Sequence, residues 1–302
     1  MSNKPEINNQ FTEQVSSPSN WAVFYLATFI FMANLFASIA IFPAYSLALG
    51  SSPFQAGMQS TVFAVASVVI RIFIGPLLDR QGPKPLMLAG IFTFATSPLL
   101  LILFPTYSML LVMRVYQAFG LAVVLPGIST LAACMAPGGR IGTYLGITRI
   151  FFNLGLMAGP STALFLIENK DYSNWFILSA ISCSIALLAM AAVRTPAVAY
   201  STERIGNFWH QMKSALSVKQ IYPIIGGIAL YSFTYSGIIS FAAIHIENTT
   251  LNGDAPIFFV ILGISGIAAC LLVGTLSDRL GRRKVGWPML AILGSGAALF
   301  YF

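Results

Sequence analysis

The chain has very little charge. Only 8% of its 302 residues are Asp, Glu, Lys or Arg, whereas 57% are hydrophobic, and the mean hydropathy is +0.81. A water-soluble domain carries about 25% charged residues, which keep its surface hydrated. The scarcity of charge therefore argues against a water-soluble enzyme, and the abundance of Leu, Ile, Val and Phe excludes a disordered chain. These numbers predict a chain that lies mostly inside a lipid bilayer.

The sequence also lacks the residue patterns of catalytic and metal sites. Its three cysteines, Cys134, Cys183 and Cys270, stand far apart in apolar stretches. We expect them to be small buried hydrophobic side chains that form neither a disulfide framework nor a metal site. The sequence has no phosphate-binding loop, no metal-ligand cluster and no paired catalytic carboxylates. We therefore expect no enzymatic activity, no cofactor and no metal, and a primary pump is disfavoured for the same reason.

Charge-free runs locate the membrane-spanning helices. A helix needs about 20 apolar residues to cross a bilayer core of roughly 30 Å. The longest run, 14–70, is interrupted between Pro43 and Pro53 by a Gly-Ser-Ser turn, so it holds two helices. The sequence predicts eight complete spans and a ninth that begins near 285 and is still apolar at Phe302. The eight spans lie near 21–44, 54–78, 85–104, 107–135, 141–166, 174–193, 221–246 and 255–276.

The polar stretch in the middle of the chain divides these spans into two groups. We predict an all-α membrane protein, with a six-helix bundle over 21–193 and an incomplete C-terminal bundle of about three helices over 221–302. Residues 1–20 form a polar cytoplasmic tail without the pattern of a cleaved signal peptide. Residues 194–220 form a cytoplasmic loop, which is either a plain linker or carries a short helix on the membrane surface.

The distribution of Lys and Arg predicts the orientation in the membrane. With the N-terminus in the cytoplasm, the inner segments hold 12 of these residues and the outer loops hold only Lys170. Cytoplasmic loops of membrane proteins are rich in Lys and Arg. We therefore expect a multi-pass protein of the cell membrane with a cytoplasmic N-terminus. The net charge of +7 reflects this topology and does not indicate nucleic-acid binding. The 12 inner residues are Lys4, Arg80, Lys84, Arg140, Arg194, Arg204, Lys213, Lys219, Arg279, Arg282, Arg283 and Lys284.

A loop motif occurs twice in the sequence. Residues 75–84 read GPLLDRQGPK and residues 274–284 read GTLSDRLGRRK. Gly, Leu, Asp, Arg and Gly recur at one fixed offset, after the second helix of each group. Such a parallel duplication is typical of one large class of secondary transporters. The motif residues are Gly75, Asp79, Arg80, Gly82 and Lys84 in the first copy, and Gly274, Asp278, Arg279, Gly281, Arg282 and Arg283 in the second.

With these two copies the sequence resembles the major facilitator superfamily. Two further segments agree with that resemblance. Arg114 to Gly120 is similar to the family's pattern in the fourth helix. Gly146, Gly155, Gly159 and Pro160 are similar to the fifth-helix pattern of exporters and antiporters.

The sequence departs from the family pattern in three ways. Pro83 replaces a basic residue of the loop motif, and Ala163 and Leu164 replace the glycine pair that usually ends the fifth-helix pattern. The chain also ends in its ninth helix, whereas the family has twelve.

The resemblance implies a secondary transporter that moves a small solute by alternating access, outward and coupled to protons. It also implies that Asp278 braces the start of the fifth helix near residues 139–142, and that Asp79 braces a helix beyond Phe302. One alternative is a non-transporting fragment or membrane adaptor that lacks the last three helices, and another is an importer of an anionic small molecule. We expect a monomer whose partners are the bilayer, the solute and protons.

Polar residues inside the predicted spans are the candidates for a substrate cavity. A charge at the centre of a span costs about 2.5–3.5 kcal/mol on insertion scales, so it usually faces a cavity or a partner. No acidic residue lies well inside a span, so the basic residues there favour an anionic or zwitterionic substrate. The candidates are Arg114 with Gln117, and Arg149 with Asn153. Arg71 is also within a span, but it can reach the inner headgroups.

Three further residues leave alternatives open. Asn34 in the first helix either faces the cavity or makes a hydrogen bond between helices. Tyr231 and Tyr235, one turn apart in the seventh helix, either line a site or pack against neighbouring helices.

Overall fold

The computed structural model describes residues 17–137, 140–167, 171–196, 217, 221–248 and 255–280. Over these ranges the chain forms eight α-helices and no strand. The helices are α2 (Pro18–Ala48), α3 (Pro53–Gln81), α4 (Pro83–Leu103), α5 (Tyr107–Met135), α6 (Ile141–Leu166), α7 (Ser173–Ala192), α9 (Ile221–Asn248) and α10 (Ala255–Leu280).

All eight helices coincide with the eight predicted spans to within a few residues at each end. Seven contain a segment long and apolar enough to cross a membrane, and in α10 the apolar segment described is the shorter Pro256–Ala269. The predicted all-α fold is therefore confirmed. The expected ninth helix after 285, the surface helix within 197–216 and most of the polar tail lie outside the described residues.

Local sequence fixes where the helices begin. Proline stands at the first position of α2, α3 and α4, where its missing N–H costs nothing. Ser52 and Gln55 form a capping box at the start of α3, in which the Ser52 hydroxyl accepts from the Gln55 backbone N–H and the Gln55 side chain accepts from the Ser52 N–H. These signals separate α2 from α3 within the single 57-residue apolar run.

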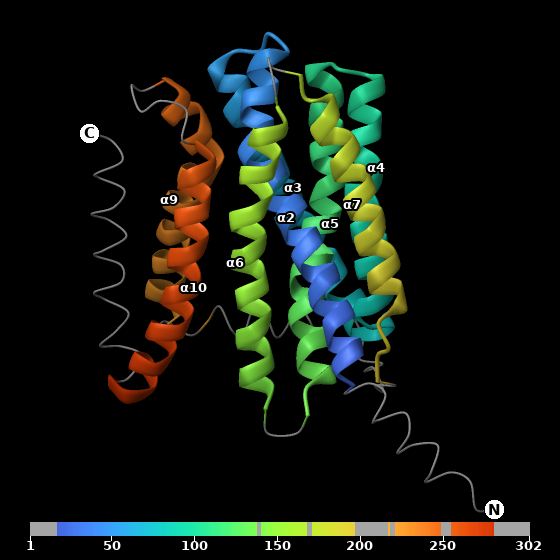
Figure 1. The fold of residues 1–302 in the computed structure, drawn as a ribbon, viewed down its shortest axis with the longest axis vertical. Coiled ribbons are helices and arrows are strands. Elements are labelled where there is room, and N and C mark those ends of the chain that lie inside the picture. The colour runs from blue at the N-terminus through green and yellow to red at the C-terminus, as the bar shows by residue number, and fades with distance from the viewer. Residues whose placement is uncertain are drawn as a thin grey trace, which may run out of the picture.

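Helices α2 and α6 hold the assembly together. α2 packs against α6, α7, α3 and α9, whereas α4 packs against α5 and α7. α6 packs against α2 on one side and against α10 on the other. In Figure 1, α9 and α10 consequently lie beyond α6, on the side of the bundle away from α4 and α7.

The outward-facing surface of the helices is apolar. Phe73, Phe165, Leu188 and Phe233 are 71–82% exposed, which is the pattern of helices that face lipid. Cys183 is fully buried, but Cys134 is exposed, so the expectation of burial was wrong for Cys134.

Candidate functional site

Arg114 lies completely inside the bundle. Its side chain is 0% exposed, and its guanidinium donates from Nε to Gln59 Oε1 of α3 at 2.5 Å and from Nη2 to the Ser38 carbonyl of α2 at 3.3 Å. Nη1 donates to Gln117 Oε1, one turn further along α5, at 3.3 Å. These acceptors are all neutral, so the charge is stabilised by dipoles rather than by a carboxylate.

Two aromatic rings complete the surroundings of Arg114. The guanidinium carbon lies 4.3 Å from the ring centroid of Phe42 and 4.6 Å from that of Phe63. A cation near an aromatic face gains about 2 kcal/mol when both are desolvated. The structure thus places Arg114 between helices and away from open surface, and its cavity-lining role stays a prediction.

Gln117 extends the network to a fourth helix. Its Nε2 donates to Ser97 Oγ of α4 at 2.7 Å. The network therefore joins α2, α3, α4 and α5 through buried polar atoms. Arg114 and Gln117 were predictable from the sequence, whereas Gln59, Ser97 and both aromatic rings were not predicted. An uncharged polar residue inside an apolar helix was a usable signal for Gln59.

Arg149 has the opposite environment. It is exposed on α6, and its guanidinium carbon lies 5.3 Å from the ring centroid of Phe152. Asn153, one turn along α6, donates from Nδ2 to the Arg149 carbonyl at 3.0 Å. This part of α6 therefore presents a basic side chain at the surface.

Asn153 also lies where α6 meets α10. A Cβ atom at Gly263 would lie 3.0 Å from the Asn153 carbonyl oxygen, and one at Gly266 would overlap the Asn153 side chain. Ser161 Oγ donates to the Pro256 carbonyl of α10 at 2.9 Å. The small residues of α10 thus permit a close α6–α10 contact, which extends from Asn153 to the end where α10 begins.

Helices α2 and α9 form a second contact between the same two groups of helices. Its core is an apolar cluster that includes Ala40 and Leu156 from the bundle, and Ile239, Ala242 and Phe259 from α9 and α10. Tyr235 is partly buried and packs against this cluster, and a role in lining a site stays a prediction. The Tyr231 side chain lies outside the described residues.

Two of the three fifth-helix glycines make the crossing of α2 and α6 possible. A Cβ atom at Gly155 would lie 2.6 Å from Met32 Cβ, and one at Gly159 would lie 2.7 Å from the Ala33 carbonyl carbon. Pro160 is buried next to them. A Cβ atom at Gly146, in contrast, would meet nothing within 4 Å.

The first loop motif forms the link between α3 and α4. Gly82 has φ +80°, a left-handed conformation that favours glycine. Lys84 Nζ donates to the carbonyls of Ala191 and Val193 at 2.8 and 2.6 Å, so this motif lysine caps the C-terminal end of α7.

Other motif residues are described only in part. Gly75 is half-buried in α3, and the side chains of Asp79 and Arg80 lie outside the description. Gly274, Asp278 and Arg279 belong to α10 without described side chains, and Gly281, Arg282 and Arg283 lie outside the described residues. The predicted bracing of residues 139–142 by Asp278 therefore lies outside them as well.

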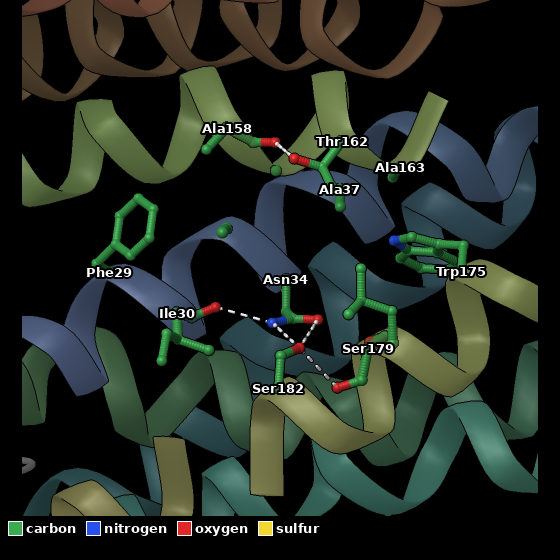
Figure 2. Close-up of a pocket in the computed structure, with 13 residues that line it drawn as sticks. Phe29, Ile30, Asn34, Ala37, Ala158, Thr162, Ala163, Trp175, Ser179 and Ser182 are labelled. Carbon is green, nitrogen blue, oxygen red and sulfur yellow. Dashed lines mark hydrogen bonds between the residues drawn. The ribbon is translucent and has the colours of Figure 1, made fainter. Parts of the chain in front are cut away.

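Asn34 faces α7 rather than α9 or α10. Its Nδ2 donates to the Ile30 carbonyl at 2.8 Å and to Ser182 Oγ of α7 at 3.0 Å. The bond to Ser182 joins two helices, as one of the two alternatives for Asn34 expected. Asn34 also lines a cavity of about 170 Å³ between α2, α6 and α7 (Figure 2).

A sequence profile of the Major Facilitator Superfamily matches residues 24–302 of the chain. The Quinolone resistance protein NorA of Staphylococcus aureus is 23% identical over 174 residues, which cover 58% of this chain and 45% of that protein. An uncharacterized MFS-type transporter of Methanocaldococcus jannaschii is 30% identical over 141 residues, covering 47% of this chain and 36% of that protein. The chain thus spans less than half the length of these curated relatives.

Solved structures of transporters share the fold. A bacterial homologue of the human lysosomal transporter Spinster, in an inward-facing and unoccupied conformation, superposes with a TM-score of 0.66 at 17% identity, over 88% of this chain and 64% of that chain. A peptide transporter in complex with alafosfalin gives 0.65 at 14% identity, over 91% and 72%. A D-xylose–proton symporter gives 0.56 at 17% identity, over 86% and 68%.

Proposed function

The chain belongs to the major facilitator superfamily of membrane transporters, and on that premise we propose that it exports a small organic solute across the cell membrane by alternating access, in exchange for protons. In this proposal α2–α7 form one half of the transporter, and α9 and α10 belong to the other half. The N-terminus is cytoplasmic, and the protein acts as a monomer.

The observation that carries this proposal is the position of α6 between the two groups of helices. On one face, Gly155 and Gly159 lie against the backbone of α2, so α6 and α2 move together. On the other face, Asn153 and Ser161 contact α10 through small residues and one hydrogen bond. The contact of α6 with α10 is nearly as extensive as its contact with α2. α6 is therefore the helix along which the two halves would rock against each other.

Exposure along α6 supports a cytoplasm-open state. The glycine contacts and the hydrogen bond with α10 named above involve α6 residues from Asn153 to Ser161, whereas Thr143, Gly146 and Arg149 nearer the start of α6 are exposed. With a cytoplasmic N-terminus, that exposed end faces the cytoplasm. An exporter receives its solute from this side.

Arg149 supports an anionic or zwitterionic solute. Its exposed guanidinium lies beside the Phe152 ring, so it offers a cation and an aromatic face to the same ligand. The name of the Staphylococcus aureus relative connects that protein with quinolones. Quinolones are planar aromatic carboxylic acids, and their carboxylate matches a guanidinium.

Everted membrane vesicles test direction, coupling and substrate class together. Vesicles from cells that express the chain are energised to an acidic interior, and uptake of a fluorescent quinolone carboxylate is followed. We expect uptake above that of vesicles without the chain, and we expect a protonophore to abolish it. Uptake only in right-side-out vesicles would instead indicate import, and no uptake in either orientation by the folded chain would contradict the proposal.

A matched pair of substitutions tests the role of Arg149. We expect Arg149→Gln to reduce quinolone uptake at least tenfold, about 1.4 kcal/mol, at unchanged protein abundance, and Arg149→Lys to retain part of it. Arg140→Gln removes an exposed cation at the start of the same helix and should leave uptake unchanged. Equal losses in the two Gln variants would indicate a general effect of charge and would overturn the assignment.

A further inference from the structure

The cavity beside Asn34 faces the lipid rather than the junction with α9 and α10. Both α6 and α7 pack against α2, and the cavity lies between them, as Figure 2 shows. Its lining residues on α6 are Ala158, Gly159, Thr162 and Ala163. Those residues lie on the opposite side of the helix from Asn153, which contacts α10.

The rim of the cavity is apolar. Leu178, which lines it, is 41% exposed, and on the same helix Ile181 and Ile185 are 54% and 49% exposed. Exposed apolar side chains on a membrane helix face hydrocarbon. A molecule that reaches this cavity therefore arrives from the bilayer.

Two polar groups in the wall have no hydrogen-bond partner among the described residues. The Trp175 side chain is 3% exposed and the Ser179 side chain 4% exposed, yet the indole N–H and the Ser179 hydroxyl donate to nothing in that part of the chain. Figure 2 shows the indole nitrogen on the edge of the ring turned toward Ala37 and Asn34. Neither atom is among the fully enclosed unpaired atoms of the described residues, so both are open to the cavity, where a ligand oxygen can accept from the indole N–H.

The side-chain oxygen of Asn34, in the floor of the cavity, can also accept a hydrogen bond from a ligand. The Ser182 hydroxyl lies 3.2 Å from the Ser179 carbonyl and 3.3 Å from Asn34 Oδ1. A hydroxyl has one proton and satisfies one of these acceptors at a time. When that proton goes to Ser179, Asn34 Oδ1 is free to accept from a ligand.

We propose that this cavity binds an uncharged, apolar small molecule from the bilayer that carries a carbonyl or hydroxyl oxygen, with that oxygen accepting from the Trp175 indole N–H. No charged residue is among the 13 that line the cavity, so an ion would lose its hydration without compensation. A dry cavity of about 150 Å³ holds a benzene-sized molecule, so about 170 Å³ suits a single substituted ring. The site is separate from the proposed transport path at Arg149, which selects charged solutes.

The test uses the indole N–H as the reporter. The full chain, labelled with ¹⁵N-tryptophan in lipid nanodiscs, is titrated with acetophenone or with α-methylstyrene, which has the same shape but a methylene in place of the carbonyl oxygen. We expect a saturable downfield shift of the Trp175 indole proton with acetophenone. We expect α-methylstyrene to bind about tenfold more weakly, the value of one buried hydrogen bond, without the downfield shift.

Trp21 is the matched internal control. Its indole N–H is fully enclosed and has no partner among the described residues, and it lies in a different cluster of the core, so its resonance should not move. Trp175→Phe removes the reporting signal and assigns it. Thr162→Phe, at an exposed rim position, should fill the cavity and abolish the shift. A Trp175 shift that does not saturate, that is equal for both compounds, or that Trp21 shares would overturn the proposal, and none of these outcomes depends on transport.

Discussion

Gly159→Ala should destabilise the protein although alanine is the better helix former. A Cβ atom at this position would lie 2.7 and 2.9 Å from the carbonyl carbon and Cα of Ala33, and it would overlap the Ala33 carbonyl oxygen. All three are backbone atoms of α2, so no side-chain rotation relieves the overlap. The helices α2 and α6 would have to separate along their whole crossing.

The expected magnitude follows from two opposing terms. Overpacking of a tight contact costs about 1–3 kcal/mol, whereas the removal of glycine from a helix interior gains roughly 0.5–1 kcal/mol. Gly146→Ala in the same helix should gain this stability without the overpacking cost, because nothing lies within 4 Å of its added Cβ. The gain is common to both variants and cancels, so we expect them to differ by the overpacking cost, about 1–3 kcal/mol in unfolding free energy, with Gly159→Ala the less stable.

Unfolding of both variants in mixed micelles, followed by circular dichroism across a denaturant series, measures this difference. Ala33→Gly should not rescue Gly159→Ala, since the obstructing atoms belong to the backbone rather than to the Ala33 side chain. Equal stability of Gly159→Ala and Gly146→Ala, or rescue by Ala33→Gly, would refute the close α2–α6 crossing.

Two further predictions concern buried or capping polar groups and use the same unfolding measurement. Gln59→Leu removes the acceptor of Arg114 Nε and should lower the unfolding free energy by about 1.5–3 kcal/mol. The double variant with Arg114→Met should recover part of that stability. An unchanged unfolding free energy for Gln59→Leu would contradict the network. Lys84→Met removes two hydrogen bonds at the end of α7 and should cost about 1 kcal/mol. Arg71→Met, at an exposed site of α3, should change stability by less than about 0.5 kcal/mol, so equal effects of Lys84→Met and Arg71→Met would argue against the cap.

The helix boundaries could be predicted because the bilayer imposes a simple rule on sequence. A spanning helix must be apolar and about 20 residues long, so charges and prolines mark its ends. The same rule identified Arg114 and Arg149 as unusual. It could not distinguish them, because a charge within a span does not show whether its side chain is buried, as for Arg114, or exposed, as for Arg149.

Contacts between distant parts of the chain were not predictable from the sequence. Gln59 and Ser38 lie 55 and 76 residues from Arg114, and no local pattern connects them. Lys84 belongs to the repeated loop motif, yet its partners are carbonyls more than 100 residues away. Asn34 donates to Ser182, 148 residues further along the chain, and no local pattern connects these two residues either.

Reversible cross-linking across the contact between α6 and α10 tests alternating access most directly. Ser161 and Pro256 are joined there by a 2.9 Å hydrogen bond. Ser161→Cys and Pro256→Cys are combined in a chain whose three native cysteines are replaced. The two new cysteines are joined with a short, reducible thiol-specific cross-linker. Quinolone uptake is measured before cross-linking, after cross-linking, and after reduction of the cross-link. Alternating access predicts that the cross-link stops uptake, that reduction restores it, and that the single-cysteine variants stay active. Full uptake by completely cross-linked protein would contradict the proposed mechanism.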